Sequence, residues 1–254
     1  MDLSTPSVIW LIVFIFLVAM LYSSVGHGGA SGYLAILSLV GGVSQNEMST
    51  TALILNLFVS LIAFISFYKA GHFSLALSWP FIVLSIPMAF LGGMIQLDNH
   101  TYYLLLSFVL ILAAIKLAIN IPLKKSNGNN NTIEKQKLYY SLPIGAGIGL
   151  LSGIVGVGGG IFLSPLIIFL RWGDLKQTSC TSAFFIFVNS IAGLLGRHYQ
   201  HRLEVGDLWI LLISAFLGGL VGSYIGAKKF SDLTLSRTLA IVLFIAAIKL
   251  ILKY

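Results

Sequence analysis

The 254-residue chain contains two copies of one unit in tandem. Three motifs of the first half return in the same order in the second half, at offsets of 130, 126 and 133 residues. The matching pairs are residues 21–30 with 151–160, 89–93 with 215–219, and 113–117 with 246–250. Each copy opens with an apolar segment that is interrupted by glycine. Duplicated, interrupted apolar segments are typical of membrane transporters whose substrate site lies where the repeats meet.

The composition places such a repeat in a membrane. Apolar residues make up 57% of the chain and charged residues 9%, and the mean hydropathy is +0.97. Soluble domains carry roughly a quarter charged residues, so this chain cannot cover a water-facing surface. Its net charge of +7 comes mainly from short loops, where basic residues set membrane orientation. We therefore expect a lipid bilayer, and no nucleic acid, as its surroundings.

The apolar segments predict an all-α polytopic membrane protein of two inverted repeats with about five helical segments each. The segments are 8–22, 31–41, 50–67, 76–95 and 102–121, then 138–153, 161–171, 179–196, 206–226 and 234–252. The second segment of each half would be about 16 Å long as a helix, roughly half of a bilayer core. We expect it to be a broken half-helix or one arm of a re-entrant pair. The repeats then span 1–121 and 138–254, joined by a polar, basic cytoplasmic linker at 122–137.

The lysine and arginine distribution predicts the orientation. If all ten segments cross, ten of these residues lie on one side and three on the other, which makes the first side cytoplasmic and puts both termini outside. Five crossings per repeat would invert the second copy. If the short segments do not cross, five of these basic residues lie on one side and eight on the other, which does not indicate an orientation. The only charged residue before the first apolar run is Asp2, so the basic segment that begins a secretory signal is missing. We therefore expect this run to be a retained membrane span.

The glycine interruptions are the first candidate site. They comprise Gly26, His27, Gly28 and Gly29 in the first copy, and Gly156, Gly158, Gly159 and Gly160 in the second. Each interruption precedes a short helix, whose start exposes free N–H groups and a partial positive charge that together attract an anion. The alternative is that the glycines serve close helix packing. Pro165, early in the second short helix, would free a backbone carbonyl or set a kink.

Polar residues in the third segments are the second candidate group. Thr51 and Thr181 occupy the same place in the repeat, whereas Asn56 and Asn189 do not align. An asparagine in an apolar helix needs a partner. Both asparagines could therefore line a substrate pathway or hydrogen-bond across helices.

The charges inside the predicted spans favour an anionic substrate. No Asp or Glu lies inside a predicted span, although cation carriers usually keep buried carboxylates. Lys116 and Lys249 share one position of the repeat, and Arg197 ends the eighth segment. These basic side chains could attract the anion at each entrance of the transport pathway. Alternatively, the two lysine side chains could simply extend to the membrane surface. His27 is the titratable group best placed for proton coupling, or it is a packed histidine.

The remaining motifs predict no catalytic or metal site. The single cysteine, Cys180, excludes an intrachain disulfide and a multi-cysteine metal centre. The helically spaced His198, His201 and Glu204 are interpreted as part of an external surface loop. We found no serine-nucleophile motif and no phosphate-binding loop. The sequence thus predicts no enzyme and no cofactor.

The paired interruptions carry a family resemblance over essentially the whole chain. The residues behind it are 153–166, supported by 181–189 and 215–219, and the chain resembles the sulfite exporter TauE/SafE (TSUP) family of permeases. The first copy departs from the pattern, with Ala30 and Ala35 where the second copy has Gly160 and Pro165. The resemblance implies a bacterial inner-membrane permease that moves small sulfur-containing anions, such as sulfite or organosulfonates. A coupling ion, H⁺ or Na⁺, is possible.

The sequence leaves three rival functions open. A passive anion channel could use the same scaffold and sites. An intramembrane enzyme would need a reactive cluster, for which the chain offers His27 and Cys180 at unrelated positions of the repeat. A membrane scaffold would use the glycines for packing alone.

Overall fold

A computed structural model of the chain describes residues 5–40, 43–118, 138–204 and 209–228, with positions 244, 247, 248 and 251 near the C-terminal end. Within these residues the chain is helical and has no strand, which confirms the all-α membrane fold. The helices are α1 (Thr5–Ser24), α2 (Ala30–Val40), α3 (Gln45–Lys69), α4 (Leu75–Met94), α5 (Asn99–Ala118), α6 (Leu138–Val155), α7 (Gly160–Phe169), α8 (Leu175–Tyr199) and α9 (Trp209–Lys228). The predicted linker at 122–137 and most of the tenth segment lie outside the described residues.

Polar caps make two helices longer than their apolar runs. Helix α3 begins five residues before the predicted segment at 50, because Ser44 Oγ accepts a hydrogen bond from the Glu47 N–H at 3.1 Å. Helix α8 begins four residues before the predicted 179, where Asp174 accepts from the Gln177 N–H at 2.8 Å and Gln177 closes a capping box. Ser44 and Asp174 are 130 residues apart, so the two halves start their third helix with the same device.

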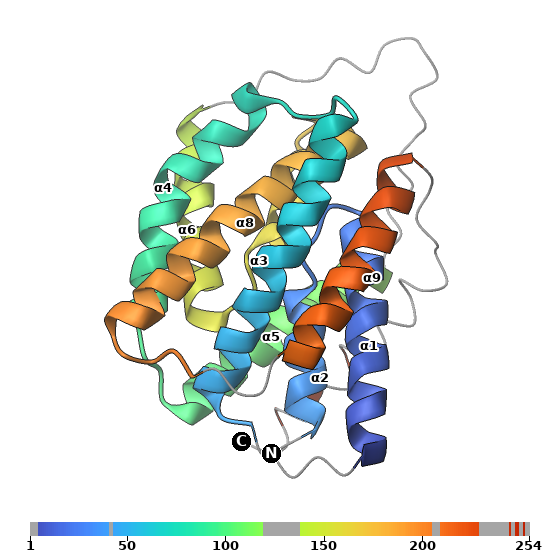
Figure 1. Cartoon of the computed structure of the whole chain (residues 1–254). Coiled ribbons are helices and arrows are strands. Elements are labelled where there is room, and N and C mark those ends of the chain that lie inside the picture. The colour runs from blue at the N-terminus through green and yellow to red at the C-terminus, as the bar shows by residue number, and fades with distance from the viewer. Residues whose placement is uncertain are drawn as a thin grey trace.

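The long helices pack as two groups around a central pair. Five of the described helices, α3, α4, α6, α8 and α9, are long and apolar enough to cross a bilayer. Helices α3 and α8 lie at the centre, with α4 and α6 on one side and α1 and α9 on the other (Figure 1). The first helix of each half packs against the fourth helix of the other half. These pairings are unchanged when the two halves are exchanged; the inversion of the second half stays a prediction.

Rows of glycine bring the paired helices into backbone contact. On α6, side chains at Gly145, Gly149 and Gly153 would collide with the carbonyl oxygens of Phe81, Ser85 and Ala89 on α4. On α9, side chains at Gly218, Gly222 and Gly226 would collide with the carbonyls of Phe16, Met20 and Ser24 on α1. Every row has four-residue spacing, the small-residue pattern of closely packed membrane helices. These rows hold the first helix of each half to the fourth helix of the other.

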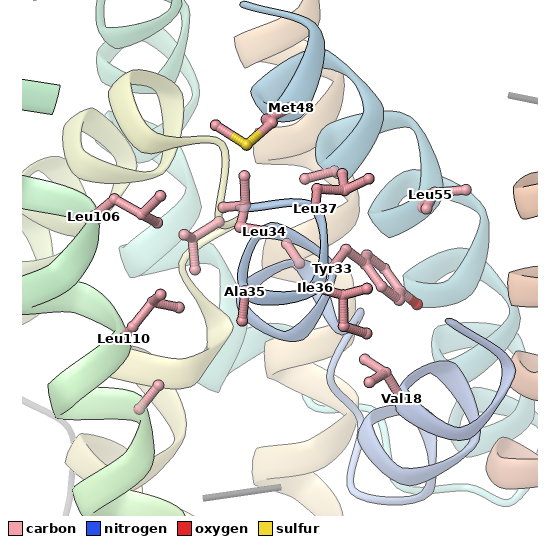
Figure 2. Packing of buried hydrophobic residues seen from close by; sticks show 14 of the residues in the cluster. Val18, Tyr33, Leu34, Ala35, Ile36, Leu37, Met48, Leu55, Leu106 and Leu110 are labelled. Atoms are coloured by element: carbon pink, nitrogen blue, oxygen red, sulfur yellow. The ribbon is translucent and has the colours of Figure 1, made fainter. Parts of the chain in front are cut away.

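The short helix α2 is enclosed by protein. Its residues from Ala30 to Leu37 are all buried. Figure 2 shows the labelled side chains of α2 with Met48 and Leu55 of α3 and Leu106 and Leu110 of α5 around them. Non-spanning helices are tolerated at membrane depth only where protein or a water-filled cavity surrounds them. The predicted short helices, α2 with 11 residues and α7 with 10, are confirmed.

Candidate functional site

Both glycine interruptions are tight turns between two helices. The first joins α1 to α2 and the second joins α6 to α7. Gly26 and Gly156 occupy equivalent positions and have φ values of 75° and 87°, a left-handed conformation that side chains other than glycine rarely adopt. Each turn therefore lets the chain leave one helix and start another within a few residues.

Each interruption packs on the central helix of the other half. A side chain at Gly26 would collide with the backbone of Ser179 on α8. A side chain at Gly156 would lie 3.0 Å from the carbonyl oxygen of Ser49 on α3. Ser49 and Ser179 are themselves 130 residues apart. The two interruptions are thus held in place by reciprocal contacts.

Asn56 of α3 lies between the two interruptions. Its Oδ1 accepts a hydrogen bond from the Ala30 N–H at 3.3 Å, at the start of α2. Its Nδ2 donates to the Val157 carbonyl at 3.4 Å and to Ser190 Oγ at 3.3 Å. Gly28 and Gly158, which are equivalent in the repeat, both have their α-carbons against this amide, so that any side chain there would collide with it. The start of α2 and the turn before α7 therefore meet at one fully buried side chain.

His27 joins the first interruption to α7. His27 is 4% exposed, and its ring has Nδ1 at 3.0 Å from the Val25 carbonyl and Nε2 at 3.0 Å from Ser164 Oγ. Because a carbonyl can only accept, Nδ1 carries a hydrogen, and Nε2 of a neutral ring is then an acceptor that shares the single Ser164 hydroxyl hydrogen with the Gly160 carbonyl. Ser164 Oγ also lies 2.7 Å from Ser182 Oγ and 3.0 Å from the Gly160 carbonyl. This polar chain crosses from the first half into the second.

The other predicted polar residues divide between partnered and unpartnered side chains. Thr181 Oγ1 lies 3.0 Å from Ser78 Oγ and so links α8 to α4. Thr51 is buried on α3, and Pro165 lies half-buried within α7. Asn189 is fully buried on α8, and within the part of the chain that the structure describes neither its Oδ1 nor its Nδ2 has a hydrogen-bond partner. An unpartnered buried amide destabilises a fold, so Asn189 is a candidate for contact with a ligand.

Arg197 lies inside the protein and not at an exposed mouth. Its side chain is 1% exposed, and Nη2 donates to the carbonyls of Gly153 at 3.1 Å and Ile154 at 2.9 Å. Those carbonyls end α6, immediately before the second interruption. Lys116 lies in α5, but its side chain is outside the described residues, as is Lys249 altogether.

The turn after α8 is partly buried. Arg202 is 8% exposed, and its Nη2 donates to the carbonyls of Gly93 at 2.6 Å and Ile95 at 3.1 Å, at the end of α4. The Glu204 carboxylate accepts hydrogen bonds from Ser44 Oγ and, at 3.4 Å, from Asn46 Nδ2. In the described part of the chain, no three His, Cys, Asp or Glu side chains converge as metal ligands.

The buried charges of the described residues are positive. Arg197 and Arg202 are buried. The acidic residues that the structure describes, Glu47, Asp98, Asp174 and Glu204, are half-buried or exposed. At Asp98, hydrogen bonding from the Thr101 N–H lowers the pKa of the carboxyl group below its usual value, so this group stays ionised at the start of α5. The interior near the interruptions therefore suits an anion better than a cation.

Several residues around the interruptions were not found from the sequence. Tyr33 of α2 places next to Gly29 a buried hydroxyl that no described residue hydrogen-bonds. Tyr102 of α5 pairs with Ser49 Oγ at 2.6 Å and donates to the Val155 carbonyl at 3.3 Å. Ser49 and its repeat partner Ser179 are recognisable in the sequence as polar residues of the third segments, but their contacts are not. No sequence feature marks Tyr33 or Tyr102, because their roles depend on helices that are distant in sequence.

Both interruptions are closed off from the surface. Residues 26–30 and 155–161 are buried without exception. A ligand at Asn56 or at the starts of α2 and α7 could enter or leave only if the surrounding helices moved apart.

Comparison with known proteins gives a family match. The family model for the sulfite exporter TauE/SafE matches residues 11–250. A probable membrane transporter protein, y4hK, from Sinorhizobium fredii is 36% identical over 96% of this chain and 98% of its own length. The probable membrane transporter proteins ORF9 from a Sinorhizobium species (26% identical; 98% of this chain, 94% of its own) and YdhB from Bacillus subtilis (22%; 86% and 88%) are also similar. No solved structure matches the chain.

Proposed function

Because the chain belongs to the sulfite exporter TauE/SafE family and is a multi-pass membrane protein, we propose that it is a secondary permease for small anions. The substrates that we propose are sulfur-containing anions such as sulfite or an organosulfonate. This substrate class rests on the description of the family, since the names of the relatives give no substrate.

The observation that carries the anion assignment is the meeting of both interruptions at Asn56. The start of α2 lies there beside the turn that precedes α7, and the first N–H groups of any helix lack intrahelical partners and carry a partial positive charge. The Ala30 N–H already donates to a side-chain oxygen, that of Asn56, which shows how these groups bind an acceptor. The described interior adds two arginines and no carboxylate. A small anion is the ligand that this environment stabilises best.

The proposed binding set combines backbone and side-chain donors. It consists of Gly26, Gly28, Gly29, Gly156, Gly158, Gly159 and Gly160 with His27, Thr51, Asn56, Thr181, Asn189 and Pro165. Within it, Asn189 is the member whose amide atoms are buried and free to contact a substrate. Asn56 and Thr181 act through the contacts that hold the helices together.

Alternating access is the mechanism that fits a buried site. Asn56 and His27 each join one half of the chain to the other. A rocking movement of one half against the other would break these contacts on one side at a time and expose the interruptions in turn. We place the protein in a bacterial inner membrane with both termini outside. Labelling of single cysteines introduced at 122–137 tests this orientation, because that linker should react only from the cytoplasmic side.

The deciding experiment is uptake of radiolabelled sulfite, sulfate and a small sulfonate into proteoliposomes, with and without pH and Na⁺ gradients. Saturable flux with counterflow of one anion supports the permease. Flux without saturation or counterflow indicates the passive channel. No flux of any of the three anions by folded protein contradicts the sulfur-anion proposal and favours the scaffold or the enzyme.

Asn189 provides the cleanest site variant. A leucine at Gly158 would collide with Asn56, so loss of transport in that variant could reflect misfolding. Asn189→Leu instead removes an amide that has no partner among the residues of the structure described above, and should leave thermal stability equal or higher while transport falls. Ser66→Ala is the control, since Ser66 lies outside the proposed binding set and the change removes only a hydrogen bond from α3 to Ser223 of α9. Unchanged sulfite flux in folded Asn189→Leu would contradict this assignment.

A further inference from the structure

Two arginines at the end of α8 are brought together by the backbone. The Arg202 N–H donates to the Arg197 carbonyl at 2.9 Å, so the turn after α8 folds back on the helix end. The side chains then reach the C-terminal ends of two neighbouring helices, Arg197 at α6 and Arg202 at α4. Those ends touch: a side-chain carbon at Gly153 would lie 2.6 Å from the Gly93 nitrogen. Both guanidinium groups therefore lie against one junction of α4 and α6.

Both guanidinium groups have donors left over. Each binds backbone carbonyls through Nη2. The Nε and Nη1 atoms of Arg197, and the Nε atom of Arg202, are buried and have no hydrogen-bond partner among the described residues. A guanidinium group is always charged and offers five N–H donors, and leaving such donors buried and unpaired is costly. Something other than the described protein atoms is needed to satisfy them.

Capping of α4 and α6 explains only part of this arrangement. A cation at a helix C-terminus is favourable, and the Nη2 contacts fulfil that role. Capping does not account for the remaining donors, nor for two buried positive charges that no carboxylate of the described residues accompanies. The nearest described carboxylate in sequence, Glu204, is instead bonded to Ser44 and Asn46.

We infer that Arg197 and Arg202 form an internal subsite for an oxoanion next to the second interruption. This inference rests on the proposed function, since the ligand is the transported anion. The free guanidinium N–H groups donate hydrogen bonds to the oxygen atoms of the anion. A planar guanidinium group can form paired hydrogen bonds to an oxoanion, which an ammonium group cannot match. The less buried Arg202 contacts the anion first, and Arg197, whose carbonyl partners lie three and two residues before Gly156, is nearer the interruption. The subsite exists in one half only, because the repeat equivalent of Arg197 is Phe67.

The test compares Arg197→Lys and Arg202→Lys with the wild-type protein in proteoliposomes, using radiolabelled sulfite. Lysine keeps a positive charge and can still donate to the helix carbonyls, but it removes the additional planar donors. We expect the KM for sulfite to rise about tenfold or more, as for the loss of a charge-assisted hydrogen bond, with a smaller change in kcat. Phe67→Leu is the matched control and should leave KM within about twofold of wild type.

The outcomes separate this inference from the proposed function. Flux in the wild type tests the permease assignment alone. With wild-type flux present, an unchanged KM in folded lysine variants would overturn the subsite. If Arg197→Lys elutes as aggregate in size-exclusion chromatography, Arg202→Lys decides the question, because Arg202 lies beyond the end of α8. A KM that rises equally in Phe67→Leu would also overturn it, since packing alone would then explain the effect.

Discussion

At the scale of single residues, two buried asparagines on the central helices differ in their hydrogen bonds. Asn56 uses both amide atoms to hold the start of α2 and the turn before α7 together. Asn189 is equally buried, yet its amide has no partner among the described residues. The first holds helices together at the centre of the molecule, while the second is the one that we propose contacts the substrate.

We predict that Asn56→Leu destabilises the protein by roughly 1–3 kcal/mol, because it leaves the Ala30 N–H and the Val157 carbonyl buried and unpaired. Thermal unfolding of purified protein in detergent measures this loss. Ser190→Ala is the control, since it removes only one contact of Asn56 and should have a smaller effect. Equal stability of Asn56→Leu and wild type would show that the amide does not hold the interruptions together.

We predict that His27→Gln removes any dependence of transport on a pH gradient while counterflow continues. A protonated ring would carry a hydrogen on Nε2, so Ser164 would have to accept there and turn its own hydrogen toward Ser182 or the Gly160 carbonyl. Glutamine can still donate to the Val25 carbonyl but cannot take up a proton. Flux measured with and without a pH gradient checks this. Wild-type gradient dependence in the variant would mean that His27 is only a packed residue.

At the scale of helices, the positions of the short helices could be predicted from the local sequence, but the helices against which each one packs could not. The short α2 and α7 follow from their apolar lengths and the preceding glycines, and both were predicted within two residues. The early starts of α3 and α8 were missed because the caps at Ser44 and Asp174 lie outside the apolar runs. The glycine rows are visible in the sequence as four-residue spacings. Their partner helices are set by long-range packing, which no local pattern specifies.

We predict that Gly149→Leu prevents correct folding, whereas Gly147→Leu on the same helix is tolerated. A side chain at Gly149 would collide with the Ser85 carbonyl on α4, so α4 and α6 would be forced apart. A side-chain carbon at Gly147 would meet no atom within 4 Å. The yield of monodisperse protein from membranes, measured by size-exclusion chromatography, compares the two. Similar yields would show that close contact of α4 and α6 is not required.

At the scale of the whole molecule, the two halves are interlocked through reciprocal contacts. Helix α1 packs on α9 as α6 packs on α4, and each interruption rests on the central helix of the other half. The duplication in the sequence predicts two related units, and this stays a prediction. The duplication could not predict that the first helix of each half packs on the fourth helix of the other half. Sequence similarity between the halves shows which segments correspond, but not which ones are in contact. The meeting point at Asn56 was missed for the same reason, since Asn56 has no equivalent asparagine in the second half.

The turn after α8 offers a way to test whether the halves move against each other. Glu204 accepts hydrogen bonds from Ser44 and Asn46, at the start of α3 in the first half, and both Ser44 and Glu204 are exposed. Alternating access requires the two halves to separate on each side in turn, so this contact must open during the cycle if it closes one mouth of the pathway.

We therefore predict that cross-linking Ser44→Cys to Glu204→Cys, in a Cys180→Ala background, stops sulfite transport. The background removes the chain's single native cysteine, which is buried. A short bifunctional thiol reagent that is cleaved by reductant should block flux, and reduction should restore it. The two single-cysteine variants, treated with the same reagent, control for labelling alone. Full transport by cross-linked protein would mean that these ends stay together throughout the cycle, and any opening movement would then have to occur between other pairs of helices.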